Sequence, residues 1–179
     1  MGKGLFPDCY FHSIYDITPE FLKGKGIRGV ILDIDNTLVF YGVYRPTARN
    51  TAWLNGLTQA GLAVAFVSNG RQQRVEEYNR DFGFYFSFRS GKPKKAGFLK
   101  AAQAMNLAPR QIAVVGDQIY TDILGGNRVG MFTCLVQPIK PEPRLPFRHK
   151  RALERPVVRR LKHRKEEETP CRRNSALPE

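Results

Sequence analysis

The stretch Gly29-Val30-Ile31-Leu32-Asp33-Ile34-Asp35-Asn36-Thr37 decides the fold class. Its first four residues form a short apolar run of the kind that is buried on both faces of a parallel sheet. Two carboxylates follow at once, spaced two residues apart. In sheets of this kind, ligands bind at the carboxyl ends of the strands. The residues that follow each apolar run therefore indicate where the chemistry lies.

Apolar runs and helical patterns alternate along the chain from residue 26 to residue 136. The predicted strands are 29–32, 62–67, 84–86, 112–115 and 131–136, and the predicted helices are 46–60, 71–80, 94–105 and 121–129. This alternation predicts an α/β fold with three layers, Rossmann-like, in which helices cover both faces of a central parallel sheet.

Residues 138–179 differ in composition from the rest of the chain. They hold seven of the 12 prolines, and 13 Lys or Arg against six Glu, so they carry +7 of the formal net charge of +13. We expect a folded domain over residues 1–137 and a basic, Pro-rich tail over 138–179 that is partly disordered. The excess of positive charge favours a polyanionic partner, which could be nucleic acid, an anionic membrane or a phosphorylated substrate.

Other features of the 179-residue chain exclude several classes of protein. Cys9, Cys134 and Cys171 lie far apart, which excludes a disulfide framework and a zinc-binding spacing and favours a reducing compartment. The sequence has no run of about 18 apolar residues and no secretory signal pattern. We therefore expect a cytoplasmic protein, with peripheral contact at a membrane surface as an extension of that expectation.

Groups that suit phosphate or metal follow four of the predicted strands. Each group alone has a simpler interpretation as a capped turn, a helix N-cap or a solvated loop lysine. Together they fall at strand ends in one consistent order. The groups are Asp33 and Asp35 after the first strand, Ser68-Asn69-Gly70 after the second, Lys92-Pro93 after the third, and Asp117 and Asp122 after the fourth.

This set resembles the haloacid dehalogenase (HAD) superfamily of aspartate-nucleophile phosphatases. Its motifs are matched here by Asp33-x-Asp35-x-Thr37, Ser68, Lys92 and Gly116-Asp117-xxxx-Asp122. The stretches Pro7-Asp8, Ser13-Ile14-Tyr15-Asp16-Ile17 and Leu32 to Leu38 resemble the YqeG-like branch of subfamily IIIA. The resemblance covers about residues 1–140.

The resemblance implies a role for each motif residue. It implies that Asp33 is the nucleophile that forms an aspartyl-phosphate, and that Asp35 is the general acid and base. Lys92 would neutralise charge, and it is preferred to Lys94 and Lys95 because Lys-Pro matches the family pattern. The resemblance further implies substrate contacts from Thr37, Ser68 and Asn69, a Mg²⁺ site formed by Asp33, Asp117 and the backbone carbonyl of Asp35, and a supporting role for Asp122.

The spacing of the motifs leaves no room for a large cap domain. About 30 residues separate Asp35 from Ser68, and a predicted helix takes up most of them. An open site admits bulky or surface-displayed phosphates. The YqeG-like branch is similar to phosphatidylglycerophosphate phosphatases. The leading substrate is therefore phosphatidylglycerophosphate, an anionic lipid. The alternatives are a nucleotide or phosphoprotein phosphatase, or an RNA- or ribosome-associated protein that binds through the basic tail.

Two further segments leave alternatives open. The aromatic N-terminus, which includes Phe6, Tyr10 and Phe11, lies either in a lipid interface or over the sheet. Residues 152–163, if helical, would place Leu153, Val157 and Leu161 on one face among basic side chains, which suits an anionic membrane surface. A solvated basic tail is the alternative. Nucleic acid ranks lower, because Phe147 is the one aromatic residue after Lys140.

Overall fold

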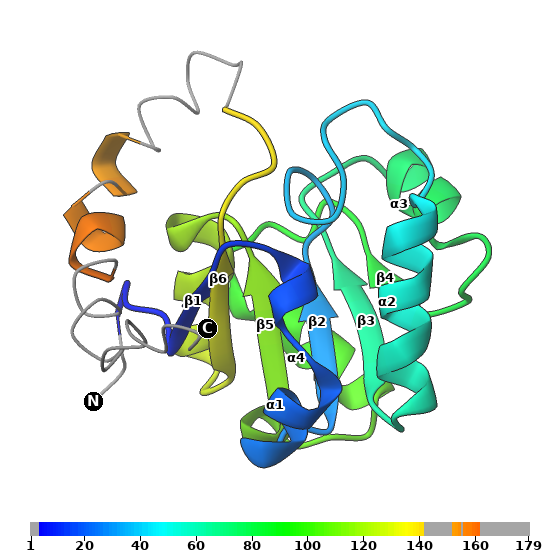
Figure 1. The fold of residues 1–179 in the computed structure, drawn as a ribbon, viewed down its shortest axis with the longest axis horizontal. Helices are drawn as coiled ribbons and strands as arrows, with labels where there is room; N and C mark the ends of the chain where they lie inside the picture. The colour runs from blue at the N-terminus through cyan, green and yellow to red at the C-terminus, as the bar shows by residue number, and fades with distance from the viewer. Residues whose placement is uncertain (1–3, 142–151, 155, 162–179) are drawn as a thin grey trace, which may run out of the picture.

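A computed structural model describes residues 4–141, 152–154 and 156–161 of the chain (Figure 1). Six parallel strands form one sheet in the order β1-β6-β5-β2-β3-β4. Their bounds are β1 Cys9–Phe11, β2 Gly29–Leu32, β3 Ala63–Val67, β4 Tyr85–Ser87, β5 Ile112–Gly116 and β6 Phe132–Val136. The parallel α/β sheet predicted from the sequence is therefore confirmed.

Helices cover both faces of this sheet. The helices are α1 Pro19–Gly24, α2 Ala48–Gln59, α3 Gln72–Asn79, α4 Lys95–Ala104 and α5 Leu124–Arg128. Short 3-10 turns lie at Ile14–Asp16 and Pro109–Gln111, and a π-helical turn at Ile119–Ile123 leads into α5. Residues 152–154 and 156–161 are also helical.

The alternation of side chains along β2 produces two separate cores. Val30 and Leu32 face a large cluster that includes side chains of α1, α2 and α3, whereas Ile31 faces a cluster with Phe98 and Ala101 of α4. Successive side chains of a strand point to opposite faces, so a continuous apolar run supplies both cores. This gives the three layers that were expected.

The N-terminal segment was not expected to form a strand. Residues 9–11 pair with β6 at the edge of the sheet, where Tyr10 lies opposite Leu135. Tyr10 is buried, Phe11 packs against the large cluster, and Phe6 is 44% exposed. Tyr10 and Phe11 therefore pack within the fold as part of the sheet itself, whereas the two alternatives placed them over the sheet or in a lipid interface.

No large cap domain interrupts residues 33–104, all of which are described. Between β2 and α2 the chain forms a loop with one isolated bridge, from Asp35 to Val39. Between β3 and α4 it forms only α3, β4 and their connections. The prediction of an open, cap-less fold is confirmed. Within the described residues, no helix is both long and apolar enough to cross a membrane.

Part of the predicted tail packs against the domain. Val157, Val158 and Leu161 contact a small buried cluster of Tyr10, Ile119, Ile123 and Leu135. Leu153, predicted to share the apolar face with Val157 and Leu161, is instead 64% exposed. The division at residue 137 stays a prediction, and residues 142–151 and 162–179 lie outside the described part.

Candidate active site

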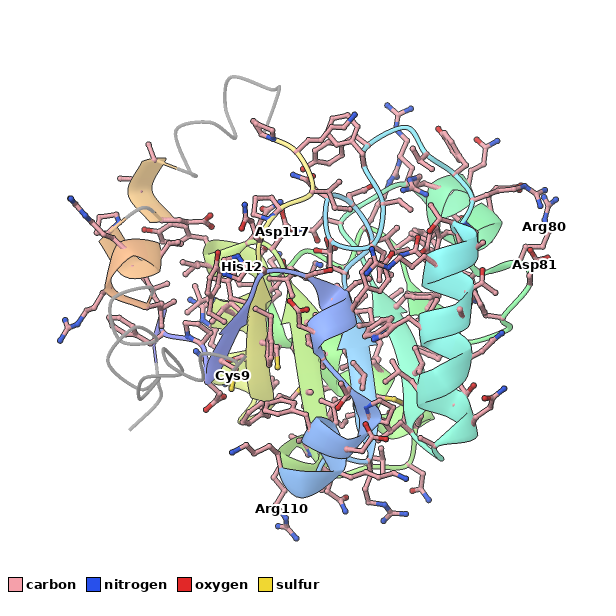
Figure 2. The ribbon with its side chains drawn as sticks, viewed as in Figure 1. Cys9, His12, Arg80, Asp81, Arg110 and Asp117 are labelled. Atoms are coloured by element: carbon pink, nitrogen blue, oxygen red, sulfur yellow. The ribbon has the colours of Figure 1, made fainter. Side chains whose placement is uncertain are left out.

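The carboxyl ends of the central strands bring the predicted site residues together. Asp33 follows β2 directly, Asp117 follows β5, and Ser68 follows β3. These three strands are neighbours in the sheet, so the residues after them meet at one edge. Figure 2 shows Asp117 at this edge, while Arg110 lies at the opposite end of the molecule.

Lys92, in the loop between β4 and α4, reaches the carboxylates. Its Nζ lies 2.6 Å from Asp33 Oδ1 and 2.7 Å from Asp122 Oδ1, and all three side chains are buried. Lys94 and Lys95 are exposed, so Lys92 is the one of these three lysines that reaches the carboxylates. Thr37 Oγ1 lies 3.1 Å from Asp117 Oδ1 and 3.3 Å from Asp33 Oδ2, and its single proton serves one of them at a time.

This buried cluster holds three carboxyl groups and a single lysine, so acidic groups are in excess. Burial raises the pKa of Asp33 to about 8, the attraction of Lys92 opposes that rise, and the carboxylates of Asp122 and Asp117 add to it. Burial alone would lower the pKa of Lys92, but the carboxylates of Asp122 and Asp33 outweigh burial and raise it. Lys92 is therefore charged, while the carboxylates of Asp117 and Asp122 disfavour a negative charge on Asp33.

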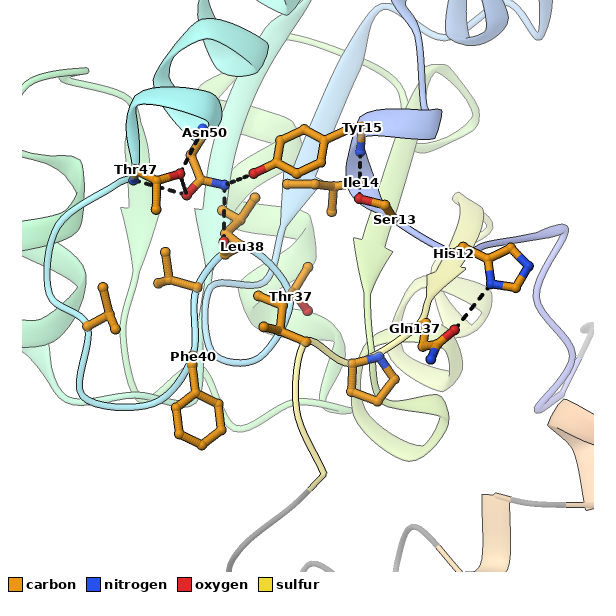
Figure 3. A pocket seen from close by; sticks show the side chains of 14 residues that line it. His12, Ser13, Ile14, Tyr15, Thr37, Leu38, Phe40, Thr47, Asn50 and Gln137 are labelled. Atoms are coloured by element: carbon orange, nitrogen blue, oxygen red, sulfur yellow. Dashed lines mark hydrogen bonds between the residues drawn. The ribbon is translucent and has the colours of Figure 1, made fainter.

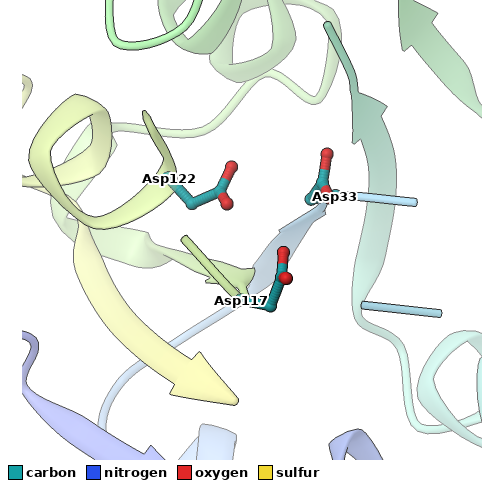
Figure 4. Close-up of side chains that lie close together, drawn as sticks. All are labelled: Asp33, Asp117 and Asp122. Atoms are coloured by element: carbon teal, nitrogen blue, oxygen red, sulfur yellow. The ribbon is translucent and has the colours of Figure 1, made fainter. Parts of the chain in front are cut away.

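The same imbalance fits a divalent cation. Asp33, Asp117 and Asp122 each offer one carboxylate oxygen, and these oxygens lie within 4.8 Å of one another (Figure 4). Carboxylate oxygens are the ligands of hard cations such as Mg²⁺, and two positive charges would offset the repulsion among them. The residues present therefore fit a divalent metal.

The side chain of Asp35 pairs with Arg74 and is not part of the cluster of Asp33, Asp117 and Asp122. Its Oδ1 accepts a hydrogen bond of 3.2 Å from Arg74 Nε and lies 3.1 Å from Arg74 Nη2. The metal role predicted for Asp35 thus rests on its backbone carbonyl alone. Arg74, on the first turn of α3, was not predicted, because its partner lies 39 residues away and nothing local distinguishes it from other arginines.

Asn69 links the two loops that carry Ser68 and Lys92. Its Oδ1 accepts a 2.8 Å hydrogen bond from the backbone N–H of Lys92, and its Nδ2 donates to the Lys92 carbonyl at 3.3 Å. Ser68 Oγ accepts from the Gly70 N–H at 2.9 Å. The Lys92–Pro93 peptide is cis. The side chain of Asn69 thus holds the lysine loop, a role that the sequence did not indicate.

Gly116 is required by the position of Asp122. A Cβ atom at residue 116 would lie 2.3 Å from Asp122 Cγ, far inside van der Waals contact. Asp122 lies on the π-helical turn and accepts hydrogen bonds from the Gln118 N–H and the Thr121 hydroxyl. The close approach of strand and turn brings Asp122 within reach of Lys92.

Two pockets are lined by residues that neighbour the carboxylates in the sequence. One, of about 500 Å³, adjoins Thr37 and is lined by residues of the N-terminal segment, the loop after β2 and the chain after β6 (Figure 3). In its lining, His12 Nδ1 lies 3.2 Å from Gln137 Oε1, within hydrogen-bond distance. The other, of about 580 Å³, adjoins Asp35 and includes Asn69, Arg71 and Arg74.

Comparison with known proteins agrees with this geometry. A HAD-hydrolase-like family model matches residues 89–138. The probable phosphatase YqeG of Bacillus subtilis (strain 168) is 36% identical over 164 residues, which are 92% of this chain and 95% of that protein. Together with the site, these matches define the class as the HAD-superfamily phosphatases. Within that class, the chain belongs to the YqeG family, and it is an enzyme.

More distant relatives carry more specific names. Phosphatidylglycerophosphate phosphatase 1, chloroplastic/mitochondrial, of Arabidopsis thaliana is 27% identical over 152 residues, which are 79% of this chain and 43% of that protein. Its chloroplastic counterpart in Chlamydomonas reinhardtii is 28% identical over 66% of this chain and 47% of that protein. The fold also matches a cobalt-bound deoxy-D-mannose-octulosonate 8-phosphate phosphatase of Haemophilus influenzae, with a TM-score of 0.52, 15% identity, and coverage of 81% of this chain and 95% of that one.

Proposed function

We propose that the protein hydrolyses a phosphomonoester with Asp33 as the nucleophile. A carboxylate oxygen of Asp33 attacks phosphorus while the bond to the leaving alcohol breaks, and Asp35 gives that alcohol a proton. Asp35 then takes a proton from the water that hydrolyses the aspartyl-phosphate and releases inorganic phosphate. The observation that carries this proposal is the buried contact of 2.6 Å between Lys92 Nζ and Asp33 Oδ1, beside Asp117 and Asp122.

Charge compensation makes this attack feasible. A carboxylate that approaches a phosphate dianion meets Coulomb repulsion, so catalysis depends mostly on positioning and charge stabilisation. Lys92 supplies one positive charge, and Asp122 fixes its ammonium group. Asp33, Asp117 and the backbone carbonyl of Asp35 would hold Mg²⁺, which when bound neutralises phosphate charge. Thr37 orients both carboxylates, and Ser68 and the N–H groups near Asn69 would contact phosphate oxygens.

The leading substrate is phosphatidylglycerophosphate. Three features support this choice: the names of the two plant and algal relatives, the absence of a large cap over residues 33–104, and the exposed Arg159 and Arg160 on the helical segment 156–161. An open site admits a head group that stays attached to a membrane. The protein would then act on lipid at the cytoplasmic membrane surface through peripheral contact.

The decisive experiment measures phosphate release by the purified full-length chain. We expect hydrolysis of p-nitrophenyl phosphate and of phosphatidylglycerophosphate in mixed micelles, and loss of both on chelation of divalent cations. Asp33→Asn should abolish both activities, whereas Asp81→Asn, an exposed acid on the same molecule, should leave them intact. Activity that survives Asp33→Asn would remove the proposed nucleophile. A preference for nucleotides or phosphoproteins over the lipid would overturn the substrate and keep the chemistry.

Membrane contact has its own test. Val157 and Leu161 are used in packing against the domain, so we expect the exposed arginines to supply the attraction to anionic lipid. The double change Arg159→Gln and Arg160→Gln should weaken sedimentation with phosphatidylglycerol vesicles, and high salt should do the same. Equal sedimentation of both proteins, or a salt-sensitive RNA complex in place of vesicle binding, would contradict this contact.

A further inference from the structure

Arg74 is a buried arginine with unused donors. The residue is 7% exposed, and its Nε donates to Asp35 Oδ1. Among the described residues, Nη1 and Nη2 find no hydrogen-bond acceptor, although Nη2 lies 3.1 Å from that same oxygen. A buried N–H group without an acceptor is costly, so buried polar groups without a partner call for an explanation.

The guanidinium of Arg74 lies close to two tyrosine rings. The ring centroid of Tyr44 lies 5.3 Å from its central carbon, and that of Tyr78 lies 5.7 Å away. Tyr78 is fully buried on α3, whereas Tyr44 is 47% exposed on the loop before α2. Tyr78 therefore packs beside the guanidinium within the core, and Tyr44 packs beside it at the surface.

Arg74 also lines a pocket on the leaving-group side of the site. This pocket, of about 580 Å³, includes Asp35, Asn69 and Arg71. Two arginines and one carboxylate thus line this pocket, and Arg74 is the arginine that contacts Asp35. The pocket that Thr37 lines has no Lys or Arg among its described lining residues. Because Asp35 is the proposed proton donor to the departing alcohol, that alcohol enters the pocket with the arginines.

We propose that Arg71 and Arg74 form a subsite for a second anionic group, carried by the alcohol part of the substrate. This inference rests on the proposed phosphomonoesterase function and names its substrate class: a phosphomonoester whose alcohol bears a phosphodiester. Arginine forks match the oxygens of a phosphate in geometry and charge. Arg71 is exposed and makes the first contact, and the ligand reaches Arg74 Nη1 when Tyr44 turns outward.

Four substrates distinguish recognition of the second anionic group from recognition of the lipid chains. Glycerol 3-phosphate and deacylated phosphatidylglycerophosphate are water-soluble, and only the second carries a phosphodiester. Phosphatidic acid and phosphatidylglycerophosphate are both lipids, and again only the second carries one. We expect kcat/KM to be at least about tenfold higher for the phosphodiester member of both pairs. A preference that appears only between lipid and soluble substrates would overturn the subsite.

Variants test the same ratio. Arg71→Gln should bring the ratio of the two kcat/KM values within each pair toward one, and the fold should survive because the Arg71 side chain makes no capping hydrogen bond to α3. Arg74→Lys keeps the charge but loses the fork, and it should lower the ratio too. The matched control, Arg110→Gln at the opposite end of the molecule, should leave the ratio unchanged.

A binding measurement keeps this inference separate from the proposed function. Glycerophosphoglycerol has the phosphodiester but no phosphomonoester, so titration calorimetry reports its binding without turnover. We expect wild-type protein to bind it and Arg71→Gln to bind it at least about tenfold more weakly. Equal binding by the two proteins, or none by wild type, would overturn the subsite. Binding without hydrolysis of any phosphomonoester would instead overturn the proposed function alone.

Discussion

Asp33 lies where burial and charge act in opposite directions. It is 7% exposed and pairs with Lys92, yet two further carboxylates lie beside it, and its pKa rises to about 8. An isolated aspartate has a pKa near 4. The metal-free folded protein therefore holds a proton at neutral pH that the unfolded chain has already released. Binding of a divalent cation must displace that proton.

This proton makes the stability of the metal-free protein depend on pH. Because the folded-state pKa of Asp33 lies above the unfolded-state value, the free energy of unfolding falls as pH rises between about 4 and 8. We expect a slope of about 1 kcal/mol per pH unit near pH 6. Urea denaturation with a chelator, at a series of pH values, measures it.

Asp33→Asn is the control for that slope. Asparagine does not titrate, so the variant should lose most of the pH dependence and should be more stable than wild type at pH 8 without metal. A divalent cation should stabilise wild type more at pH 8 than at pH 6, because less proton has to be displaced. An identical slope in both proteins would show that another group carries the titration.

Gly116 leaves the space in which the Asp122 side chain lies. Gly116→Ala would drive a Cβ into Asp122 and displace it from Lys92, so we expect a loss of activity of about 100-fold or more. Gly56→Ala on α2 is the matched change, since a Cβ there has nothing within 4 Å. It should stabilise the protein by about 0.5–1 kcal/mol and leave activity unchanged. Phosphate release and thermal denaturation measure the two effects.

The placement of Asp33, Lys92, Asp117 and Asp122 in one cluster could be predicted from the sequence. Each of them follows a strand or opens a helix, and parallel strands bring such residues to one edge. The partner of Asp35 could not be predicted. Arg74 reaches it across 39 residues, and because Arg71 and Arg80 flank the helix that carries Arg74, nothing local marks which of these arginines turns inward.

Among the helices and strands, the extent of burial determines how well the sequence pattern predicts an element. The central strands β2, β3 and β5 are buried along nearly their whole length, and their continuous apolar runs predicted them well. Strand β1 has only three residues and lies at the edge, paired with residues about 125 positions away, so no local pattern marks it. In α4, Leu99 is 45% exposed, whereas Ala101 is buried, so the apolar pattern alone does not distinguish the buried face.

The loops after β3 and β4 act as one unit through Asn69. Asn69→Ala removes the acceptor of the Lys92 N–H and the donor to the Lys92 carbonyl, so we expect a loss of about 1–3 kcal/mol in stability. Activity should fall as well, because Lys92 loses its anchor. Urea denaturation and phosphate release measure these losses. Asn69→Asp keeps the acceptor alone and should lie between wild type and Asn69→Ala.

The exposed Asn55 on α2 gives the matched control for this loop. Asn55→Ala should change stability by less than about 0.5 kcal/mol. If Asn69→Ala behaved in the same way as Asn55→Ala, the link between the two loops would not be structural.

At the scale of the whole molecule, the C-terminal segment contributes to the site from outside the sheet. Glu154 is buried, and its Oε1 accepts hydrogen bonds of 2.8 Å from the Ile119 N–H and 3.4 Å from the Tyr120 N–H. These donors open the π-helical turn that carries Asp122. A carboxylate at the start of a helix satisfies N–H groups that have no partner within the helix. The tail therefore stabilises the turn that positions Lys92.

Removal of this contact should affect both stability and catalysis. We expect Glu154→Ala to lower stability by about 1–2 kcal/mol and to reduce phosphate release, while Glu154→Gln, which still offers an acceptor, recovers part of both.

Truncation after residue 141 should lower stability further, because it also uncovers the apolar cluster beneath Val157 and Leu161. The truncated protein should bind a hydrophobic dye more strongly. Deletion of residues 166–179 alone is the matched control and should leave stability, activity and dye binding near wild type. If the two truncated proteins had the same stability, activity and dye binding, the segment 152–161 would contribute nothing to the fold. Glu154→Ala should then have no effect either.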